Sequence, residues 1–299
     1  MNPTTGLAEL DDRIASAAAA AGAELFAHAR NLRTGAQLGW DADASVVTAS
    51  VFKVPVLVEY LRQVDAGVID PTSRIQVTDA NRTQGPTGLS VFTDDADWSV
   101  RDIATSMITV SDNAATDILA GLVGIDRVNA SMRELGLPGT VLEGDCNTLF
   151  ESMALDLGTA DDAEIEAMMS ADSDLVRKLR VCDPQRTNRS TPSESTELLG
   201  KLWTDQAASP AGCAEARRIL GLQVWPHRLS SGFPADDIRI SGKTGTIGIV
   251  RNEIGVVEFP DGGQFAVAVF VRTHKFGYRQ PPADALIGVV ASALVDSLR

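Results

Sequence analysis

Aromatic residues, cysteines and histidines are scarce in this sequence of 299 residues. Phe, Trp and Tyr make up 5% of the chain, so the hydrophobic core has to consist mainly of Ala, Val, Leu and Ile. The three cysteines, Cys146, Cys182 and Cys213, are odd in number and widely spaced, which argues against a disulfide framework and a structural zinc site. No His-Glu-x-x-His motif accompanies the three histidines. We therefore expect no metal and no cofactor.

Long apolar runs are also missing. No stretch approaches the length of a membrane-spanning helix, about 18 uninterrupted apolar residues, so no membrane span is predicted. The first residues lack the basic and apolar regions of a signal peptide, so we expect a cytoplasmic protein unless Met1 replaced a signal. The formal net charge of −14 predicts repulsion from nucleic acid and from anionic membranes, and neither is expected as a partner.

Hydrophobic periodicity predicts strands near both ends of the chain and helices between them. Helices are predicted at about 7–21, 100–108, 113–122, 126–135, 163–170, 193–203, 214–220 and 282–298, with a further one from Ser50 to about residue 66, and strands at 23–30, 36–40, 237–243, 250–259 and 264–271. This order favours an α+β fold of three layers, α/β/α, with an antiparallel sheet built from both termini. We expect one catalytic unit over 1–299, with a sheet subdomain at about 1–48 and 222–299 and a helical subdomain at about 49–221.

Three short motifs carry the chemistry. They are Ser50-Val51-Phe52-Lys53, Ser111-Asp112-Asn113 and Lys243-Thr244-Gly245, in that order. Each alone is weak, because a capping serine before a solvated lysine, a turn or a strand end gives the same letters. Together, in this order, they form a recognised signature of acyl-transferring serine enzymes.

The first motif contains a nucleophile and a base. Ser50 is predicted to open a helix, where the positive end of the helix dipole lies, and Lys53 is on the same helix face. A serine hydroxyl is a weak nucleophile until a base removes its proton. Lys53 can be that base if burial and a second cation lower its pKa, and Lys243 is predicted to be the second cation.

The complete set resembles the serine β-lactamase and D,D-peptidase superfamily, and class A β-lactamases most of all, over about residues 22–299. The resemblance implies a β-lactamase/transpeptidase-like fold and an acyl-enzyme on Ser50. It implies that Lys53 takes the proton of Ser50, and that Ser111, oriented by Lys243, passes a proton to the leaving nitrogen. Asn113 would hold Lys53 and the substrate amide.

The same resemblance implies the rest of the substrate site. Thr244 and Lys243 would bind a carboxylate on a small-molecule substrate, and the backbone N–H groups of Ser50 and Thr246 would form the oxyanion hole. Arg251 is either a second partner for that carboxylate or a surface charge.

One part of the class A pattern is absent. Those enzymes release the acyl group with a glutamate in a Glu-x-x-Leu-Asn motif, and no such motif occurs here. In the corresponding segment Cys146 falls on the glutamate, Leu149 on the leucine and Phe150 on the asparagine. Cys146 is then either a buried core residue or a second nucleophile. The nearby acids Glu143, Asp145 and Glu151 are either solvated charges or a displaced base, and the segment from about 151 to 186 is longer than the resemblance implies.

We therefore predict a serine hydrolase that forms an acyl-enzyme at Ser50 on an amide, ester or β-lactam carbonyl. Two enzymatic alternatives remain: a true β-lactamase with a relocated base, and a D,D-carboxypeptidase or acyltransferase. A third alternative is a penicillin-binding sensor that becomes acylated without turnover.

Overall fold

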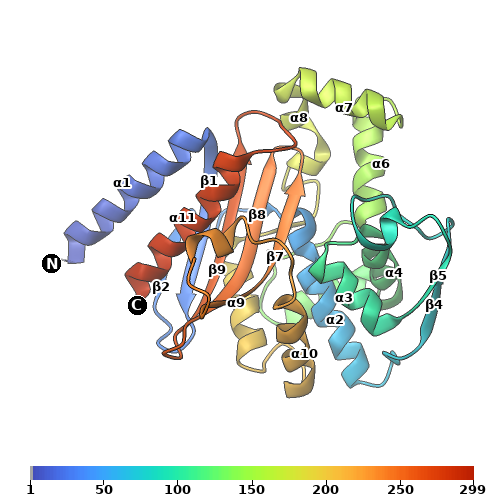
Figure 1. The fold of residues 1–299 in the computed structure, drawn as a ribbon, viewed down its shortest axis with the longest axis horizontal. Coiled ribbons are helices and arrows are strands. Elements are labelled where there is room, and N and C mark those ends of the chain that lie inside the picture. The colour runs from blue at the N-terminus through green and yellow to red at the C-terminus, as the bar shows by residue number, and fades with distance from the viewer. Residues whose placement is uncertain (1–2) are drawn as a thin grey trace.

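A five-stranded antiparallel sheet forms the centre of the computed structural model, which describes residues 3–299, with side chains from residue 9 onward. The strands, in the order β2-β1-β9-β8-β7, are β1 (Ala23–Asn31), β2 (Gln37–Trp40), β7 (Arg239–Ile247), β8 (Val250–Glu258) and β9 (Gln264–Thr273). β1 pairs with β9 along its whole length, so the two ends of the sequence meet in the middle of the sheet, as predicted (Figure 1).

Two terminal helices cover one face of the sheet. They are α1 (Pro3–Ala21) and α11 (Pro281–Leu298), which pack on β1 and on each other. By length and composition alone α11 could cross a membrane, but half of it is buried inside the protein. Its side chains Leu286, Ile287 and Val290 lie in a core cluster with the apolar residues of β1 and β9. α11 is therefore a core helix here.

The helical part of the chain covers the other face and completes the three predicted layers, which confirms the fold class (Figure 1). Its predicted helices are present as α2 (Lys53–Asp65), α3 (Val100–Thr109), α4 (Asn113–Val123), α5 (Ile125–Glu134), α7 (Asp162–Ala171), α9 (Pro192–Trp203) and α10 (Pro210–Leu220). Short pieces connect them: β3 (Val46–Val47) with β6 (Arg189–Ser190), β4 (Arg74–Val77) with β5 (Ala96–Ser99), and the 3-10 turns η1 (Ala49–Phe52), η2 (Gly88–Val91), η3 (Arg180–Cys182) and η4 (Leu229–Gly232).

The start of α2 differs from the prediction. The α-helix begins at Lys53, and Ser50 lies in η1, one short turn earlier. The chain leaves β3 and has to change direction before α2 begins, and Ala49 adopts a positive φ of 44° at this point. Ser50 therefore lies in a 3-10 turn that runs directly into α2, so the predicted helix begins with a short 3-10 segment.

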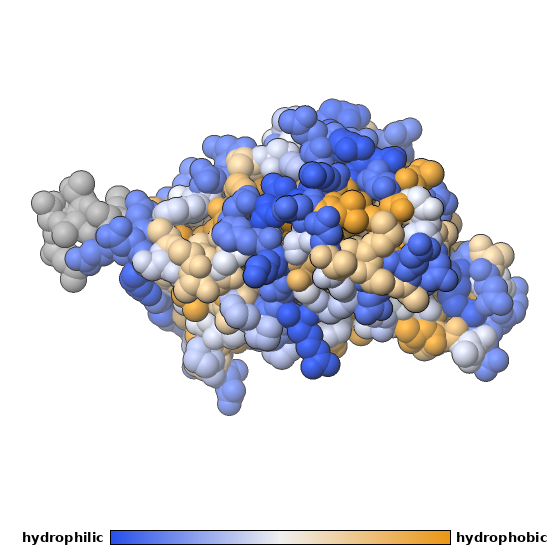
Figure 2. Space-filling model, turned by 90° about the horizontal axis from the view of Figure 1, so that it is seen from above, coloured by the Kyte–Doolittle hydropathy of each residue, from blue (hydrophilic) through white to orange (hydrophobic). Residues whose placement is uncertain are grey.

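The long segment after residue 141 folds into helices that the sequence analysis partly missed. α6 (Cys146–Leu157), α7 and α8 (Ser173–Lys178) follow one another and project beyond the sheet (Figure 1). Figure 2 shows the molecule from that side, where hydrophilic residues cover much of the face. The signals for α6 were present: Asp145 caps it at Thr148 N, and Cys146, Leu149, Met153 and Leu157 are buried at helical spacing.

A close approach of two glycines fixes η4 on α11. A Cβ atom on Gly288 would lie 2.7 Å from the nitrogen of Gly232 and 2.7 Å from the carbonyl oxygen of Arg228. Because backbone atoms cannot move away as a side chain can, only glycine allows α11 to approach η4 this closely.

We expect Gly288→Ala to lower the free energy of unfolding by about 2 kcal/mol, because an overpacked contact costs about 1–3 kcal/mol. Gly121→Ala in α4 is the matched control, because no atom lies within 4 Å of the added Cβ. It should raise stability by up to about 1 kcal/mol through helix propensity. Urea unfolding followed by circular dichroism measures both, and equal stability of the two variants would contradict the close contact.

Candidate active site

The three motifs meet around the hydroxyl group of Ser111. The Lys53 ammonium donates to the carbonyl oxygen of Ser111 at 2.7 Å and lies 3.3 Å from its Oγ. The Lys243 ammonium reaches the same Oγ at 2.9 Å from the opposite element, β7. Both lysine side chains are fully buried. One hydroxyl therefore contacts two buried amines, which is an arrangement suited to moving protons between them.

Burial lowers the pKa of both amines. The pKa of Lys53 falls below its ordinary value because its charged form loses water. The pKa of Lys243 falls well below its ordinary value, first through burial and then through the charge of Lys53. Asn113 holds Lys53 in place, since its Oδ1 accepts from Nζ at 2.9 Å while its amide donates to Gln84 O at 3.1 Å. Burial thus shifts the pKa of Lys53 in the direction that a general base requires.

The turn that presents Ser111 is strained and firmly held. Ser111 has a positive φ of 61°, which non-glycine residues rarely adopt. The buried carboxylate of Asp112 accepts from Leu89 N at 2.6 Å and Ser106 Oγ at 2.7 Å, and caps α4 by accepting from Ala115 N at 3.1 Å. These bonds fix the turn, and strain held by its surroundings is typical of functional sites.

β7 lies directly against the turn that carries Ser50. A Cβ atom on Gly245 would lie 2.5 Å from Thr48 O and 3.2 Å from Val51 N, so only glycine fits here. Asn252 of β8 anchors the same segment, because its Nδ2 donates to Thr48 O at 3.1 Å. This packing brings the strand that contains Thr246 to the turn that carries Ser50, as the predicted oxyanion hole of Ser50 and Thr246 requires.

Arg251 does not face the site, so the prediction that it could bind the substrate carboxylate is corrected. Its guanidinium donates to the carbonyl oxygens of Val250 at 2.8 Å and Gly277 at 2.6 Å, and it is buried. Each of its hydrogen bonds goes to a backbone carbonyl group, either at the β7–β8 turn or in the loop after β9. The alternative of a surface charge is also wrong, because Arg251 is 3% exposed.

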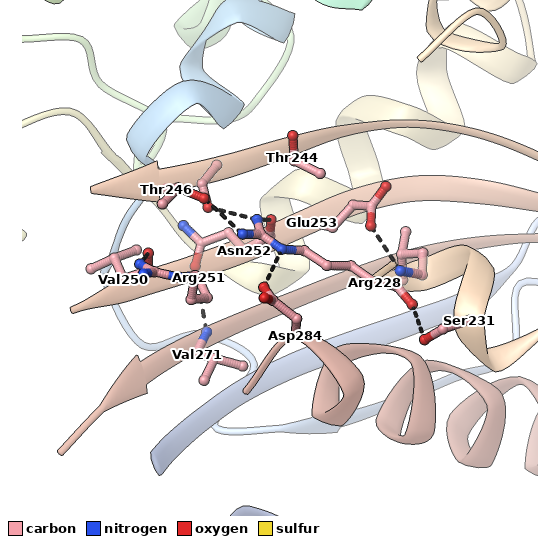
Figure 3. A network of polar contacts seen from close by, with 12 residues as sticks. Arg228, Ser231, Thr244, Thr246, Val250, Arg251, Asn252, Glu253, Val271 and Asp284 are labelled. Atoms are coloured by element: carbon pink, nitrogen blue, oxygen red, sulfur yellow. Dashed lines mark hydrogen bonds and ion pairs between the residues drawn. The ribbon is translucent and has the colours of Figure 1, made fainter. Parts of the chain in front are cut away.

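The sequence analysis missed Arg228, which lies where an arginine for the substrate carboxylate was expected. Figure 3 shows its side chain between Thr246 of β7 and Asp284 of α11. Its Nη2 donates to Thr246 Oγ1 at 2.7 Å, and its Nε pairs with Asp284 at 2.8 Å. Thr244 and Thr246 point to the same side of β7, because alternate residues of a strand share a face. No local motif surrounds Arg228, so only the tertiary fold reveals it.

Cys146 lies next to Asn113, the residue that holds Lys53. Its Sγ is 3.4 Å from Asn113 Oδ1, and its backbone nitrogen donates to Asp117 at 2.7 Å. Burial raises the pKa of this thiol to about 12, so it is neutral at physiological pH. It belongs to the core cluster, in agreement with the prediction of a buried cysteine. A neutral thiol cannot take the place of a carboxylate base.

The three acids near Cys146 are engaged elsewhere. Glu143 pairs with Arg189 at 2.6 Å, Asp145 caps α6, and Glu151 is exposed and accepts from Asn147 Nδ2 at 2.8 Å. Among the described residues none of the three forms a hydrogen bond with Lys53 or Ser111. In the same described part of the chain, no group of three His, Cys, Asp or Glu side chains is arranged to hold a metal ion. None of the three acids is therefore held in place as a displaced base.

Known proteins share this fold and family. The family model described as the beta-lactamase enzyme family matches residues 9–298. The beta-lactamase regulatory protein BlaB of Streptomyces cacaoi is 33% identical over 284 residues, which cover 90% of this chain and 91% of the relative. A β-lactamase from Sphaerobacter thermophilus superposes with a TM-score of 0.75 at 26% identity, over 94% of this chain and 95% of that one.

A second kind of structural neighbour is PBP-A. A mutant of PBP-A, solved as an acyl-enzyme complex with penicillin G, superposes with a TM-score of 0.77 over 98% of this chain and 97% of that one. At 22% identity this likeness concerns the fold alone. With the family match it confirms the resemblance found in the sequence: the chain belongs to the β-lactamase enzyme family, with a fold of the class A type.

The neutral state of Cys146 can be tested directly. We expect iodoacetamide at pH 8 to leave Cys146 unmodified in the folded protein, because the reagent needs a thiolate and burial holds the pKa of the thiol at about 12. In guanidinium chloride the same residue should react within minutes. Peptide mapping by mass spectrometry identifies the site, and rapid alkylation of folded protein would show that the thiol is exposed and ionisable.

Proposed function

We propose that the protein is a serine hydrolase that acylates Ser50 with a carboxylate-bearing β-lactam, or with a related amide or ester, and releases the acyl group slowly. The observation that carries the proposal is the pair of buried amines on the Ser111 hydroxyl, one of them from Lys53 at the start of the helix that follows Ser50, with a neutral thiol where a deacylating carboxylate would lie. The first arrangement favours acylation, and the second removes the usual means of hydrolysis.

Acylation proceeds through one proton relay. Ser50 Oγ forms a bond to the substrate carbonyl carbon while Lys53, as the neutral amine, takes its proton. The oxyanion accepts hydrogen bonds from the backbone N–H groups of Ser50 and Thr246. Collapse of this intermediate breaks the carbon–nitrogen bond, and the proton passes from Lys53 through Ser111 Oγ to the leaving nitrogen. Contacts of 3.3 Å and 2.9 Å from the two amines to Ser111 Oγ support this path.

The substrate carboxylate binds on the opposite side of Ser111 from Lys53. Lys243 provides a cation, and the hydroxyl groups of Thr244 and Thr246 provide donors on one face of β7. Arg228 adds a second positive charge next to Thr246. This concentration of positive charge in an otherwise acidic protein favours an anionic small molecule as substrate.

Slow release makes the acyl-enzyme long-lived, which suits a penicillin-binding sensor or an acyl transfer to another acceptor. The name of the 33% identical relative, a regulatory protein, favours the sensor. A chromogenic cephalosporin with intact-mass detection tests the proposal. A single burst and a persistent mass increment are expected, whereas sustained turnover would establish a β-lactamase with a relocated base.

The nucleophile and its base are tested by Ser50→Ala and Lys53→Ala. We expect Ser50→Ala to form no adduct with benzylpenicillin, and Lys53→Ala to acylate about 10²–10⁴-fold more slowly, because that is the usual contribution of a general base. Intact-mass kinetics measure both. Thermal unfolding by circular dichroism is the control for a folded protein, and normal acylation of either folded variant would refute the mechanism.

Cys146→Glu places a carboxylate beside Lys53 and Asn113. We expect it to hydrolyse the benzylpenicilloyl adduct at least about tenfold faster than the parent protein, because the carboxylate can activate a water molecule. Cys146→Gln is the matched control of equal size without a charge, and its adduct should persist. The decay of the mass increment after rapid removal of free benzylpenicillin is the measurement. Equal decay of both variants and parent would show that position 146 does not limit release.

A further inference from the structure

The peptide group between Gly245 and Thr246 contains one of the two predicted donors of the oxyanion hole. It lies in β7, an edge strand whose only neighbour in the sheet is β8. Thr244 N donates to the side chain of Gln223 at 2.7 Å, so this N–H points away from β8. Alternate N–H groups of a strand point to the same side, so the N–H of Thr246 also points to the free edge. The carbonyl group of Gly245 belongs to the same planar peptide and therefore points the opposite way, towards β8.

Arg228 binds this carbonyl group. Its Nη1 donates to Gly245 O at 3.0 Å and to Asn252 O at 2.8 Å, and its Nη2 donates to Thr246 Oγ1 at 2.7 Å. Figure 3 shows the side chain reaching across the face of the sheet towards Thr246. Together with the bond from Nε to Asp284, these contacts use four of the five N–H groups of the guanidinium. Too few N–H groups are left for a bidentate bond to a substrate carboxylate.

The helix α11 and the turn η4 hold Arg228 in place. Its carbonyl oxygen accepts from Ser231 Oγ at 2.6 Å and lies directly against Gly288 of α11. Its guanidinium pairs with Asp284 of the same helix. The residue is buried. The positive charge is therefore fixed next to Gly245 O in a part of the protein that excludes water, where charges are little screened.

A cation bound to a peptide oxygen has two effects on the N–H group of the same peptide. Because the peptide group is planar, a fixed oxygen also fixes the direction of the N–H. Hydrogen bonds in a chain polarise one another, so a charge-assisted bond to the oxygen makes the N–H a stronger donor. Both effects act on the N–H of Thr246, at the place where negative charge develops on the substrate oxygen in the predicted oxyanion hole.

We propose that Arg228 is a positioning residue of the oxyanion hole, which directs and polarises the peptide group between Gly245 and Thr246 so that its N–H stabilises the oxyanion formed during acylation of Ser50. The inference rests on the proposed function, and it names a residue that sets the rate of the first step. Arg228 contacts no reacting atom and acts through this peptide group. Its charge adds to the attraction for a substrate carboxylate, but its hydrogen bonds serve the oxyanion hole.

Benzylpenicillin and its uncharged methyl ester separate this role from carboxylate binding. We expect Arg228→Gln to lower the second-order acylation constants of both probes by a similar factor, about tenfold or more, because the loss of a whole oxyanion-hole donor costs about 10²–10³-fold. A residue that only bound the substrate carboxylate would affect benzylpenicillin and leave the methyl ester unchanged. Intact-mass kinetics give the constants, and thermal unfolding by circular dichroism shows whether the variant is folded.

Infrared difference spectroscopy of the benzylpenicilloyl adduct gives a readout that a loss of stability alone does not change. An isotopic label identifies the band of the ester carbonyl group, whose stretching frequency falls as the donors of the oxyanion hole become stronger. Arg228→Gln should therefore shift this band to higher wavenumber. Arg251→Gln is the matched control, because Arg251 is also buried and donates to the carbonyl groups of Val250 and Gly277, but not to that of Gly245. Its adduct should show the band of the parent protein.

An unshifted band in folded Arg228→Gln, or slower acylation by benzylpenicillin alone, would overturn the proposal. If that variant does not fold, the double variant Arg228→Gln, Asp284→Asn removes the ion pair as a unit and leaves neither charge unpaired, and the same results are expected. If neither variant folds, a parent adduct whose band lies at the same wavenumber before and after unfolding in guanidinium chloride overturns the proposal. Each of these results refutes this inference alone, whereas a parent protein that forms no adduct with either probe refutes the proposed function as well.

Discussion

Two buried lysines on one hydroxyl are the constraint around which the active site is organised. Removing two like charges from water is costly, and their mutual repulsion adds to the cost. Burial lowers the pKa of both amines, and Asn113 accepts a hydrogen bond from Lys53. The feature that is unfavourable for folding therefore suits the acyl transfer proposed above.

Two of the four non-glycine residues with positive φ in the described chain lie at the site. Ala49 precedes Ser50 and Ser111 carries the hydroxyl that both lysines contact, and both residues have positive φ angles. The surrounding structure holds each of them: β7 packs on the first through Gly245, and Asp112 holds the second with a set of buried hydrogen bonds. The sheet therefore fixes the turn that carries Ser50, and the helical part fixes Ser111. The site exists only where these two parts of the protein meet.

The sequence was most informative where chemistry is encoded in adjacent residues. The Ser50, Ser111 and Lys243 motifs are local, so their order alone indicated the family and much of the site. Arg228 belongs to no motif, and it reaches the site through a contact with Thr246 of β7. Arg251 was misassigned because the hairpin geometry that turns its guanidinium towards Gly277 cannot be read from its position after Lys243. α6 was overlooked because its segment was compared with a family loop and not judged by its own periodicity.

The pairing of β1 with β9 has a consequence for how the protein acquires its reactivity during synthesis. Ser50, Lys53 and Ser111 are made early, but Lys243 and the strands that hold it come from the last quarter of the chain. A growing chain therefore carries the serine long before it has the second amine, Arg228 or the central strand of the sheet. Long-range strand pairing of this kind forms late in folding. Under the mechanism proposed above, Ser50 would therefore become reactive only after the sheet has closed.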